Sequence, residues 1–291
     1  MKIYLARHRG FCSGVKRSIR LAEKTLEDAH GPVYILNDIV HNKSVIEELR
    51  TKGLRRVGSP ARARGGALLI SSHGVSPAIM QQAHEAAKAV VDTTCPLVDR
   101  IHAAAKAYID ESREVLLFGD AEHDEVNGIV GIDPEHIHVV KNKSDVGDLS
   151  EFDRPVALIS QSTSSVHDFE RMANLIRARF GDIEVNDTIC RPTRLRQAAV
   201  NKLCEMAEIV VVIGSKTSAN SNRLVEIAAK QGRKSILIDN AGEFDLRLLG
   251  GVKAMGITTG ASTPEALVIG LIDRIKEFCA IKNEPVEIAD V

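Results

Sequence analysis

A repeat of strand, polar turn and helix, returning about every 90 residues, is the feature that most constrains the fold of this 291-residue chain. Short apolar runs alternate with amphipathic helical patterns, and continuous Val, Ile and Leu runs are typical of parallel strands covered on both faces. We therefore predict an α/β fold. The main expected strands are Val33–Leu36, Ala67–Ser71, Val115–Phe118, Val156–Ile159, Ile209–Ile213, Ser235–Ile238 and Ala254–Thr258.

Each repeat contains two polar turns, each placed between a strand and a helix, and then a strand that leads to a cysteine. The C-terminal repeat lacks its last strand, and the N-terminal segment with Cys12 supplies one. We predict three similar lobes related by a pseudo-threefold axis, with the polar turns pointing inward. The expected lobes are residues 13–96, residues 97–191, and residues 192–291 completed by residues 1–12.

Three of the five cysteines, Cys12, Cys95 and Cys190, stand at matching places in the repeats. Three converging thiolates without an obvious fourth ligand indicate a metal centre with one open position. Structural zinc usually takes four ligands, often with C-x-x-C spacing, which is absent here. A 4Fe–4S cluster on three cysteines leaves one iron open as a Lewis acid. Three unrelated buried thiols are the alternative, and burial in the core is our interpretation of Cys204 and Cys279.

The polar turns carry histidine, serine and asparagine at matching positions. Helix N-termini offer unpaired N–H groups and a positive dipole, so several converging turns would bind a diphosphate. Helix capping is the alternative, but it does not explain cysteines in the same register. The chain has no Walker motif or G-x-G-x-x-G, which argues against a nucleotide. The residues of this expected cradle are His41, His73, His123, Ser218, Asn220 and Ser262, beside Ser162 and Thr163.

The other histidines, including His102, are interpreted as surface or structurally satisfied groups. Glu125 starts a helix two residues after His123, and a carboxyl group in a closed cavity can deliver protons. A first-turn glutamate favoured by the helix dipole is the alternative. A basic stretch is interpreted as a solvated loop, with a docking patch for an acidic electron carrier as the alternative; its residues are Lys52, Arg55, Arg56, Arg62 and Arg64.

Composition excludes some classes of protein. The net charge of −1 gives no global attraction to nucleic acid or anionic membranes. No apolar run approaches the roughly 20 residues that a membrane span needs, and the N-terminus does not resemble a signal peptide. An odd number of cysteines without disulfide-like spacing favours a cytoplasmic protein with reduced thiols.

Taken in order, the motifs resemble the 4-hydroxy-3-methylbut-2-enyl diphosphate reductase (LytB) family over essentially the whole chain. Each motif is weak alone, but their joint order and spacing are specific. They are Gly-Phe-Cys12-Ser-Gly-Val, His41-Asn, Ser-His73-Gly-Val, Thr-Cys95-Pro-Leu, His123-x-Glu125-Val, Gln161-Ser162-Thr163, Cys190-x-x-Thr193-x-x-Arg196-Gln197, Ser218-Ala-Asn220-Ser-x-Arg-Leu and Gly-Ala-Ser262-x-Pro.

The resemblance implies a three-lobed cloverleaf around a central 4Fe–4S cluster held by Cys12, Cys95 and Cys190, with the open iron taking the substrate hydroxyl. It implies reductive removal of the allylic hydroxyl, giving isopentenyl and dimethylallyl diphosphates in the last step of the methylerythritol phosphate route. Ferredoxin or flavodoxin would supply electrons. Glu125 would relay protons with help from Ser162 and Thr163, and the diphosphate would bind to His41, His73, His123, Ser218, Asn220 and Ser262.

The sequence departs from the family pattern at three places, which comprise four residues. Ser162 stands where Thr is common, and Arg191-Pro192 follows the third cysteine where small or aromatic residues are frequent. Ala219 stands where Ser is frequent, so one diphosphate hydrogen bond, of about 1 kcal/mol, is lost or replaced. Two other functions stay open. One is a quinolinate-synthase-like dehydratase, which lacks the His123-x-Glu125 motif; the other is an iron–sulfur redox sensor, although the chain shows no basic helix-turn-helix pattern.

Overall fold

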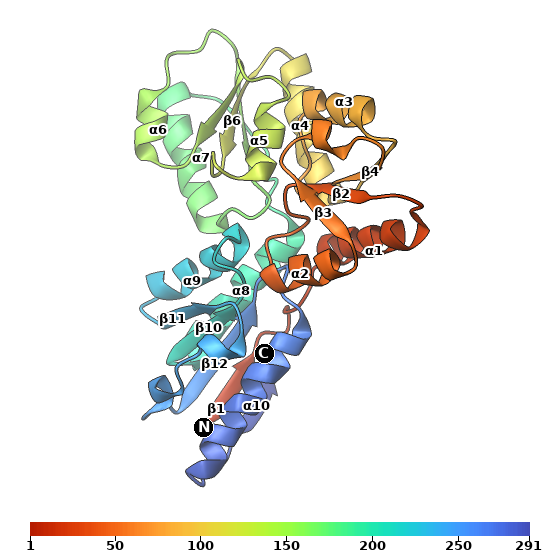
Figure 1. The fold of residues 1–291 in the computed structure, drawn as a ribbon. Helices are drawn as coiled ribbons and strands as arrows, with labels where there is room; N and C mark the ends of the chain where they lie inside the picture. The colour runs from red at the N-terminus through yellow and green to blue at the C-terminus, as the bar shows by residue number, and fades with distance from the viewer. The chain divides into compact units, whose positions relative to one another are not determined.

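The computed structural model describes residues 1–291 and contains three parallel sheets, which confirms the predicted α/β fold of three lobes (Figure 1). By compactness the chain divides into two units. The smaller unit comprises residues 1–13, 41–43 and 191–291, and the larger unit comprises residues 14–40 and 44–190. The lobe boundaries and the cloverleaf arrangement stay predictions.

The first sheet of the larger unit has the strand order β3–β2–β4–β5, with every pair parallel. Its core consists of aliphatic side chains from the strands, with Ala63 from a 3-10 helix and Ala83 from the helix after β4. The elements in chain order are α1 (Ser13–Asp28), β2 (Val33–Leu36), α2 (Lys43–Thr51), β3 (Leu54–Val57), the 3-10 helix η1 (Pro60–Ala63), β4 (Ala67–Ile70), α3 (Pro77–Ala86) and β5 (Ala89–Asp92).

The second sheet of the larger unit repeats this order as β7–β6–β8–β9. Alternate residues of β6 face opposite cores: Val115 and Leu117 pack with α4 and α5, whereas Leu116 and Phe118 pack with α7. Burial on both faces explains the continuous apolar run in the sequence. The elements are α4 (Pro96–Asp110), β6 (Glu114–Phe118), α5 (Asp124–Val130), β7 (Ile137–Val140), α6 (Lys143–Asp148), β8 (Val156–Ser160), α7 (Val166–Phe180) and β9 (Glu184–Val185).

The sheet of the smaller unit has the order β11–β10–β12–β1–β13, all parallel. The N-terminal strand β1 pairs with β12, the place that β5 and β9 take in the other sheets, so red and blue strands lie side by side in Figure 1. The elements are β1 (Lys2–Leu5), α8 (Arg191–Met206), β10 (Ile209–Ile213), α9 (Ala219–Lys230), β11 (Lys234–Ile238), η2 (Ala241–Glu243), η3 (Leu246–Leu249), β12 (Ala254–Thr259), α10 (Glu265–Ile281) and β13 (Glu287–Asp290).

Three strands, β3, β7 and β13, were not expected from the sequence, and each lies at the edge of its sheet. The interpretation of the basic stretch as a solvated loop was wrong for β3. Leu54 and Val57 are buried, and Arg55 and Arg56 between them are exposed, a pattern typical of a charged edge strand. No helix combines the length and apolar character needed to cross a membrane.

Candidate active site

Each of the three cysteines of the expected metal centre makes the same kind of backbone hydrogen bond. In each case the cysteine N–H donates to the carbonyl of the residue just before His73, Thr163 or Ser262. The bonds are Cys95 N to Ser72 O at 3.0 Å, Cys190 N to Ser162 O at 3.1 Å and Cys12 N to Ala261 O at 3.0 Å. Each half-buried cysteine is therefore tied to a polar turn at the carboxyl end of a parallel strand, where ligands bind in α/β sheets.

Cys204 and Cys279 occupy different surroundings. Both lie within helices, in α8 and α10, and both are buried among aliphatic side chains, which confirms their interpretation as core residues. Burial raises the pKa of each thiol, so each resists forming the thiolate that a metal needs. The donor set available to a metal cluster is thus Cys12, Cys95 and Cys190, three thiols without a nearby fourth in sequence, and this chemistry fits a cluster with one open iron.

Glu125 lies in the first turn of α5 and is buried. Its Oε1 accepts a hydrogen bond from Ser162 N at 2.6 Å, and its Oε2 accepts one from Ser162 Oγ at 2.7 Å. Burial raises the pKa of this carboxyl group above its ordinary value of 4.5, although both Ser162 bonds act in the lowering direction. The Ser162 carbonyl also accepts a hydrogen bond from Cys190 N. The Glu125 carboxyl group, which can carry a proton, is therefore linked to Cys190 through Ser162.

His123 caps the N-terminus of α5. Its Nδ1 accepts a hydrogen bond from Glu125 N at 3.1 Å, so the ring proton lies on Nε2. The ring meets His73 edge to face, with centroids 5.4 Å apart. The structure thus brings two histidines of the expected cradle together in the larger unit, and capping fixes the orientation of one of them.

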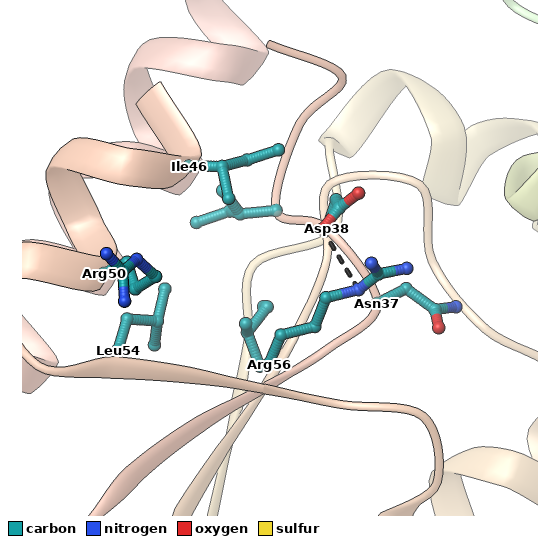
Figure 2. Close-up of a pocket in the computed structure, with 8 residues that line it drawn as sticks. Asn37, Asp38, Ile46, Arg50, Leu54 and Arg56 are labelled. Carbon is teal, nitrogen blue, oxygen red and sulfur yellow. Dashed lines mark ion pairs between the residues drawn. The ribbon is translucent and has the colours of Figure 1, made fainter. Parts of the chain in front are cut away.

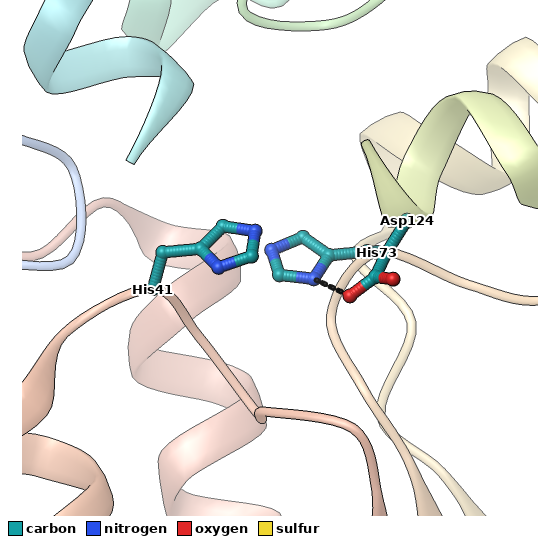
Figure 3. A group of neighbouring side chains, drawn as sticks. All are labelled: His41, His73 and Asp124. Atoms are coloured by element: carbon teal, nitrogen blue, oxygen red, sulfur yellow. Dashed lines mark ion pairs between the residues drawn. The ribbon is translucent and has the colours of Figure 1, made fainter. Parts of the chain in front are cut away.

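Asp124 is a site residue that the sequence analysis missed. Its Oδ2 lies 4.0 Å from His73 Nδ1 (Figure 3). Its Oδ1 accepts from Asn37 Nδ2 at 3.3 Å. The carboxylate therefore lies beside the ring of an expected cradle histidine. The only signal in the sequence was an acidic residue between His123 and Glu125.

The turn after β8 presents polar atoms without protein partners. Gln161 Oε1 accepts from Asp120 N at 3.1 Å, whereas Gln161 Nε2 and Thr163 Oγ1 are buried and unpartnered. Buried polar atoms are normally hydrogen-bonded, so these two indicate a missing polar ligand. Gly119 packs tightly beside this turn, since a Cβ there would lie 2.9 Å from Val126 Cγ2 and 3.1 Å from the Cβ of Gln161.

The matching turn of the smaller unit carries Ser218 and Asn220 at the start of α9. Ser218 Oγ caps the helix by accepting from Ser221 N at 3.3 Å. Asn220 is buried, and neither Nδ2 nor Oδ1 of its amide has a partner. A buried amide with every hydrogen-bonding group unused fits a polar ligand at this helix N-terminus.

Two further expected residues meet in the smaller unit. Ser262 Oγ, in the turn after β12, donates to the backbone carbonyl of His41 at 3.0 Å.

Ser221 Oγ fills the space between the turns after β10 and β12, since a Cβ at Gly214 or Gly260 would lie 2.3 or 2.2 Å from it. Ser218, Asn220, Ser262 and Cys12 are thus on turns at one edge of this sheet.

His102 differs from its interpretation as a surface or satisfied group. Its Nε2 is buried and has no partner, and burial lowers the pKa of the ring, which keeps it neutral. The ring fits against two glycines: a Cβ would lie 3.2 Å from Nε2 at Gly74 and 3.3 Å from Cε1 at Gly128. It therefore packs beside the His73 turn and the Glu125 helix.

A small cavity beside β3 contains none of the expected site residues. It encloses about 60 Å³ between β3, the end of β2 and α2 (Figure 2). Its charged residue Asp38 pairs with Arg56 at 3.1 Å. The cavity is too small for a substrate, and Asp38 in its lining is already paired, so the polar turns are the better candidate for a substrate site.

These observations define a class: an α/β protein of three parallel sheets with cysteines and unsatisfied polar groups at the carboxyl ends of its strands. Within that class, the chain belongs to the LytB protein family, whose model matches residues 3–276.

Curated relatives carry one name. A protein of Cutibacterium acnes named 4-hydroxy-3-methylbut-2-enyl diphosphate reductase is 42% identical over 277 residues, covering 94% of this chain and 86% of the relative. A protein of the same name from Zymomonas mobilis is 38% identical over 291 residues, covering 99% and 86%.

Solved structures agree with this membership. The E-1-hydroxy-2-methyl-but-2-enyl-4-diphosphate reductase of Plasmodium falciparum matches with a TM-score of 0.91 at 29% identity, covering 99% of this chain and 92% of that one. A second reductase structure, described as the terminal enzyme of the non-mevalonate pathway, matches with a TM-score of 0.68 at 32% identity, covering 95% and 99%.

Proposed function

We propose that this chain is an iron–sulfur reductase that converts 4-hydroxy-3-methylbut-2-enyl diphosphate to isopentenyl and dimethylallyl diphosphates, the terminal step of the non-mevalonate isoprenoid pathway. Membership of the LytB family and the names of its relatives support the activity. The observation that carries the proposal is the buried Glu125 carboxyl group joined through Ser162 to the Cys190 backbone. This arrangement supports a role for Glu125 as a proton donor near an expected cluster ligand.

Cys12, Cys95 and Cys190 would hold a 4Fe–4S cluster. When bound, the cluster supplies electrons and an open iron that acts as a Lewis acid toward the substrate oxygen. The overall reaction consumes two electrons and two protons, breaks the allylic C–O bond, forms a C–H bond and releases water. The protein must therefore bind the diphosphate, orient the hydroxyl group and deliver protons.

The residues expected to bind diphosphate lie on polar turns in each unit. In the larger unit, the Nε2–H of His123 and the His73 ring beside Asp124 are suitable donors. In the smaller unit, Ser218, Asn220 and Ser262 would contribute with His41. The unused amide of buried Asn220 supports this role, whereas Ala219 offers only a methyl group at the first position of α9.

Glu125 would carry the proton. Its raised pKa keeps a larger share of the carboxyl group protonated near neutral pH than an exposed glutamate would keep. Ser162 Oγ is bonded to Glu125 Oε2, and Thr163 Oγ1 has no protein partner; we propose that these hydroxyl groups pass a proton onward.

Electrons would come from ferredoxin or flavodoxin in the cytoplasm. The exposed arginines of the basic stretch, Arg55, Arg62 and Arg64, would suit an acidic electron carrier, whereas Lys52 and Arg56 already pair with acidic residues of this chain.

The test is anaerobic turnover with a reduced viologen dye and reconstituted protein, with the products read by mass spectrometry. We expect both five-carbon diphosphates from the wild type and from Glu122→Gln, which changes an exposed glutamate near the site. Glu125→Gln should lose most turnover while keeping its cluster. No product from wild-type protein with a full cluster would refute the reductase, and wild-type turnover by Glu125→Gln would refute the proton relay.

A further inference from the structure

Arg196 of α8 follows Cys190 in one motif of the sequence, but the proposed reaction assigns Arg196 itself no role. Its side chain is only 4% exposed, yet it carries a permanent positive charge. Its Nη2 donates to the carbonyl of Gly10 at 2.6 Å, and its Nη1 donates to Pro192 O at 3.3 Å. The short bond joins helix α8 to the loop that carries Cys12, and both lie in the smaller unit.

The same loop is held from its other side by β12 and the turn after it. Gly10 N donates to Thr259 Oγ1 at 2.7 Å, and Cys12 N donates to Ala261 O at 3.0 Å. Gly10 has φ +74, a left-handed conformation that favours glycine, and a Cβ there would lie 3.2 Å from Glu265 Oε2. Thr259 and Ala261 therefore accept hydrogen bonds from the N–H groups of the loop. Arg196 instead donates to the carbonyl of Gly10.

Burying a guanidinium costs desolvation free energy. The buried position of Arg196 therefore implies that its charge or its hydrogen bonds contribute to the structure or the function. A hydrogen bond from a charged donor is about twice as strong as a neutral one and fixes the acceptor in direction. A nearby positive charge also stabilises the reduced, more negative form of an iron–sulfur cluster.

We infer that Arg196 is a positioning residue, which fixes the Cys12 loop through Gly10 and raises the reduction potential of a cluster bound there. The effect on potential rests on the proposed function, because it requires Cys12 to be a cluster ligand. The fixing of the loop is a property of the chain itself and does not depend on the reaction.

The first experiment measures cluster properties in Arg196→Met, which removes the charge, and Arg196→Lys, which keeps the charge but loses the planar fork. Lys202→Met removes an exposed charge from the same helix and is the control. We expect a lower midpoint potential and faster cluster loss in air for Arg196→Met, a potential near wild type for Arg196→Lys, and no change for the control. Wild-type potential and decay in Arg196→Met, or an equal change in Lys202→Met, would overturn the inference.

The second experiment follows alkylation of Cys12 by iodoacetamide, with sites read by mass spectrometry in cluster-free protein. Arg196→Met should alkylate Cys12 about tenfold faster, the scale of one lost charge-assisted hydrogen bond, while Cys95 keeps its wild-type rate. If Arg196→Met does not fold, as judged by circular dichroism, Arg196→Lys replaces it with a smaller increase expected. Equal acceleration at Cys12 and Cys95 would indicate general loosening and contradict the positioning role. A wild-type protein that binds a cluster but reduces no substrate would refute the proposed function while leaving this inference intact.

Discussion

Burial, more than hydrogen bonding, sets the chemistry of the Glu125 carboxyl group. Desolvation raises its pKa, and the two Ser162 bonds act the other way without overcoming it. Because the folded-state pKa lies above 4.5, the neutral carboxyl group stabilises the fold at low pH, and that contribution is lost as pH rises through the raised pKa.

We predict that infrared difference spectra will show the carbonyl band of a protonated carboxyl group persisting above pH 4.5 in the wild type and missing in Glu125→Gln. The spectra should be recorded during a pH titration. If the band is already lost before the rising pH reaches 4.5, the effect of the Ser162 bonds on the pKa outweighs that of burial. Glu125 would then be ionised whenever the enzyme works.

Asp124 lies beside a histidine of the expected cradle. Asp124→Asn removes the carboxylate 4.0 Å from His73 Nδ1, so we expect KM for the diphosphate substrate to rise with little change in kcat. An ion pair at this exposure contributes up to about 1 kcal/mol, which corresponds to about fivefold. Asp133→Asn, which breaks the surface pair with His136, is the control. Equal KM values for the two variants would contradict an orienting role for Asp124.

At the scale of elements, the start of α9 depends on a close approach of two turns. A Cβ on Gly214 would lie 2.3 Å from the buried Ser221 Oγ, so Gly214→Ala must displace the first turn of α9 with Asn220. We predict that this variant raises KM more than it lowers thermal stability, as measured by steady-state kinetics and calorimetry.

The control is Gly270→Ala in α10, where a Cβ meets nothing within 4 Å. It should stabilise the protein by about 0.5–1 kcal/mol, the gain of alanine over glycine inside a helix, without changing KM. An unchanged KM in Gly214→Ala would mean that the α9 turn does not bind substrate.

The sequence predicted the central strands well because their apolar runs are buried on both faces. Strand β10, Ile209–Ile213, matches its expected bounds. The edge strands escaped prediction because Leu54–Val57 and Glu287–Asp290 mix charged and apolar residues, and they become strands only by pairing with a neighbour.

For the whole molecule, the expected site residues are shared between the two compact units. Residue types at the ends of strands could be predicted from the repeat, since each turn has the same position relative to its strand. The roles of Asp124, His102 and Arg196 could not, because they depend on contacts between segments far apart in the sequence. The meeting of Cys12 with Cys95 and Cys190 on one cluster stays a prediction.

The most direct test of the account is the iron and sulfide content of five cysteine-to-alanine variants after anaerobic reconstitution. We predict one 4Fe–4S cluster per chain in the wild type and in Cys204→Ala and Cys279→Ala, whose thiols lie in apolar cores. Cys12→Ala, Cys95→Ala and Cys190→Ala should each lose the cluster, because each removes one of its three expected thiolate ligands. A full, stable cluster in Cys12→Ala would contradict this prediction, since Cys12 would then not be a ligand.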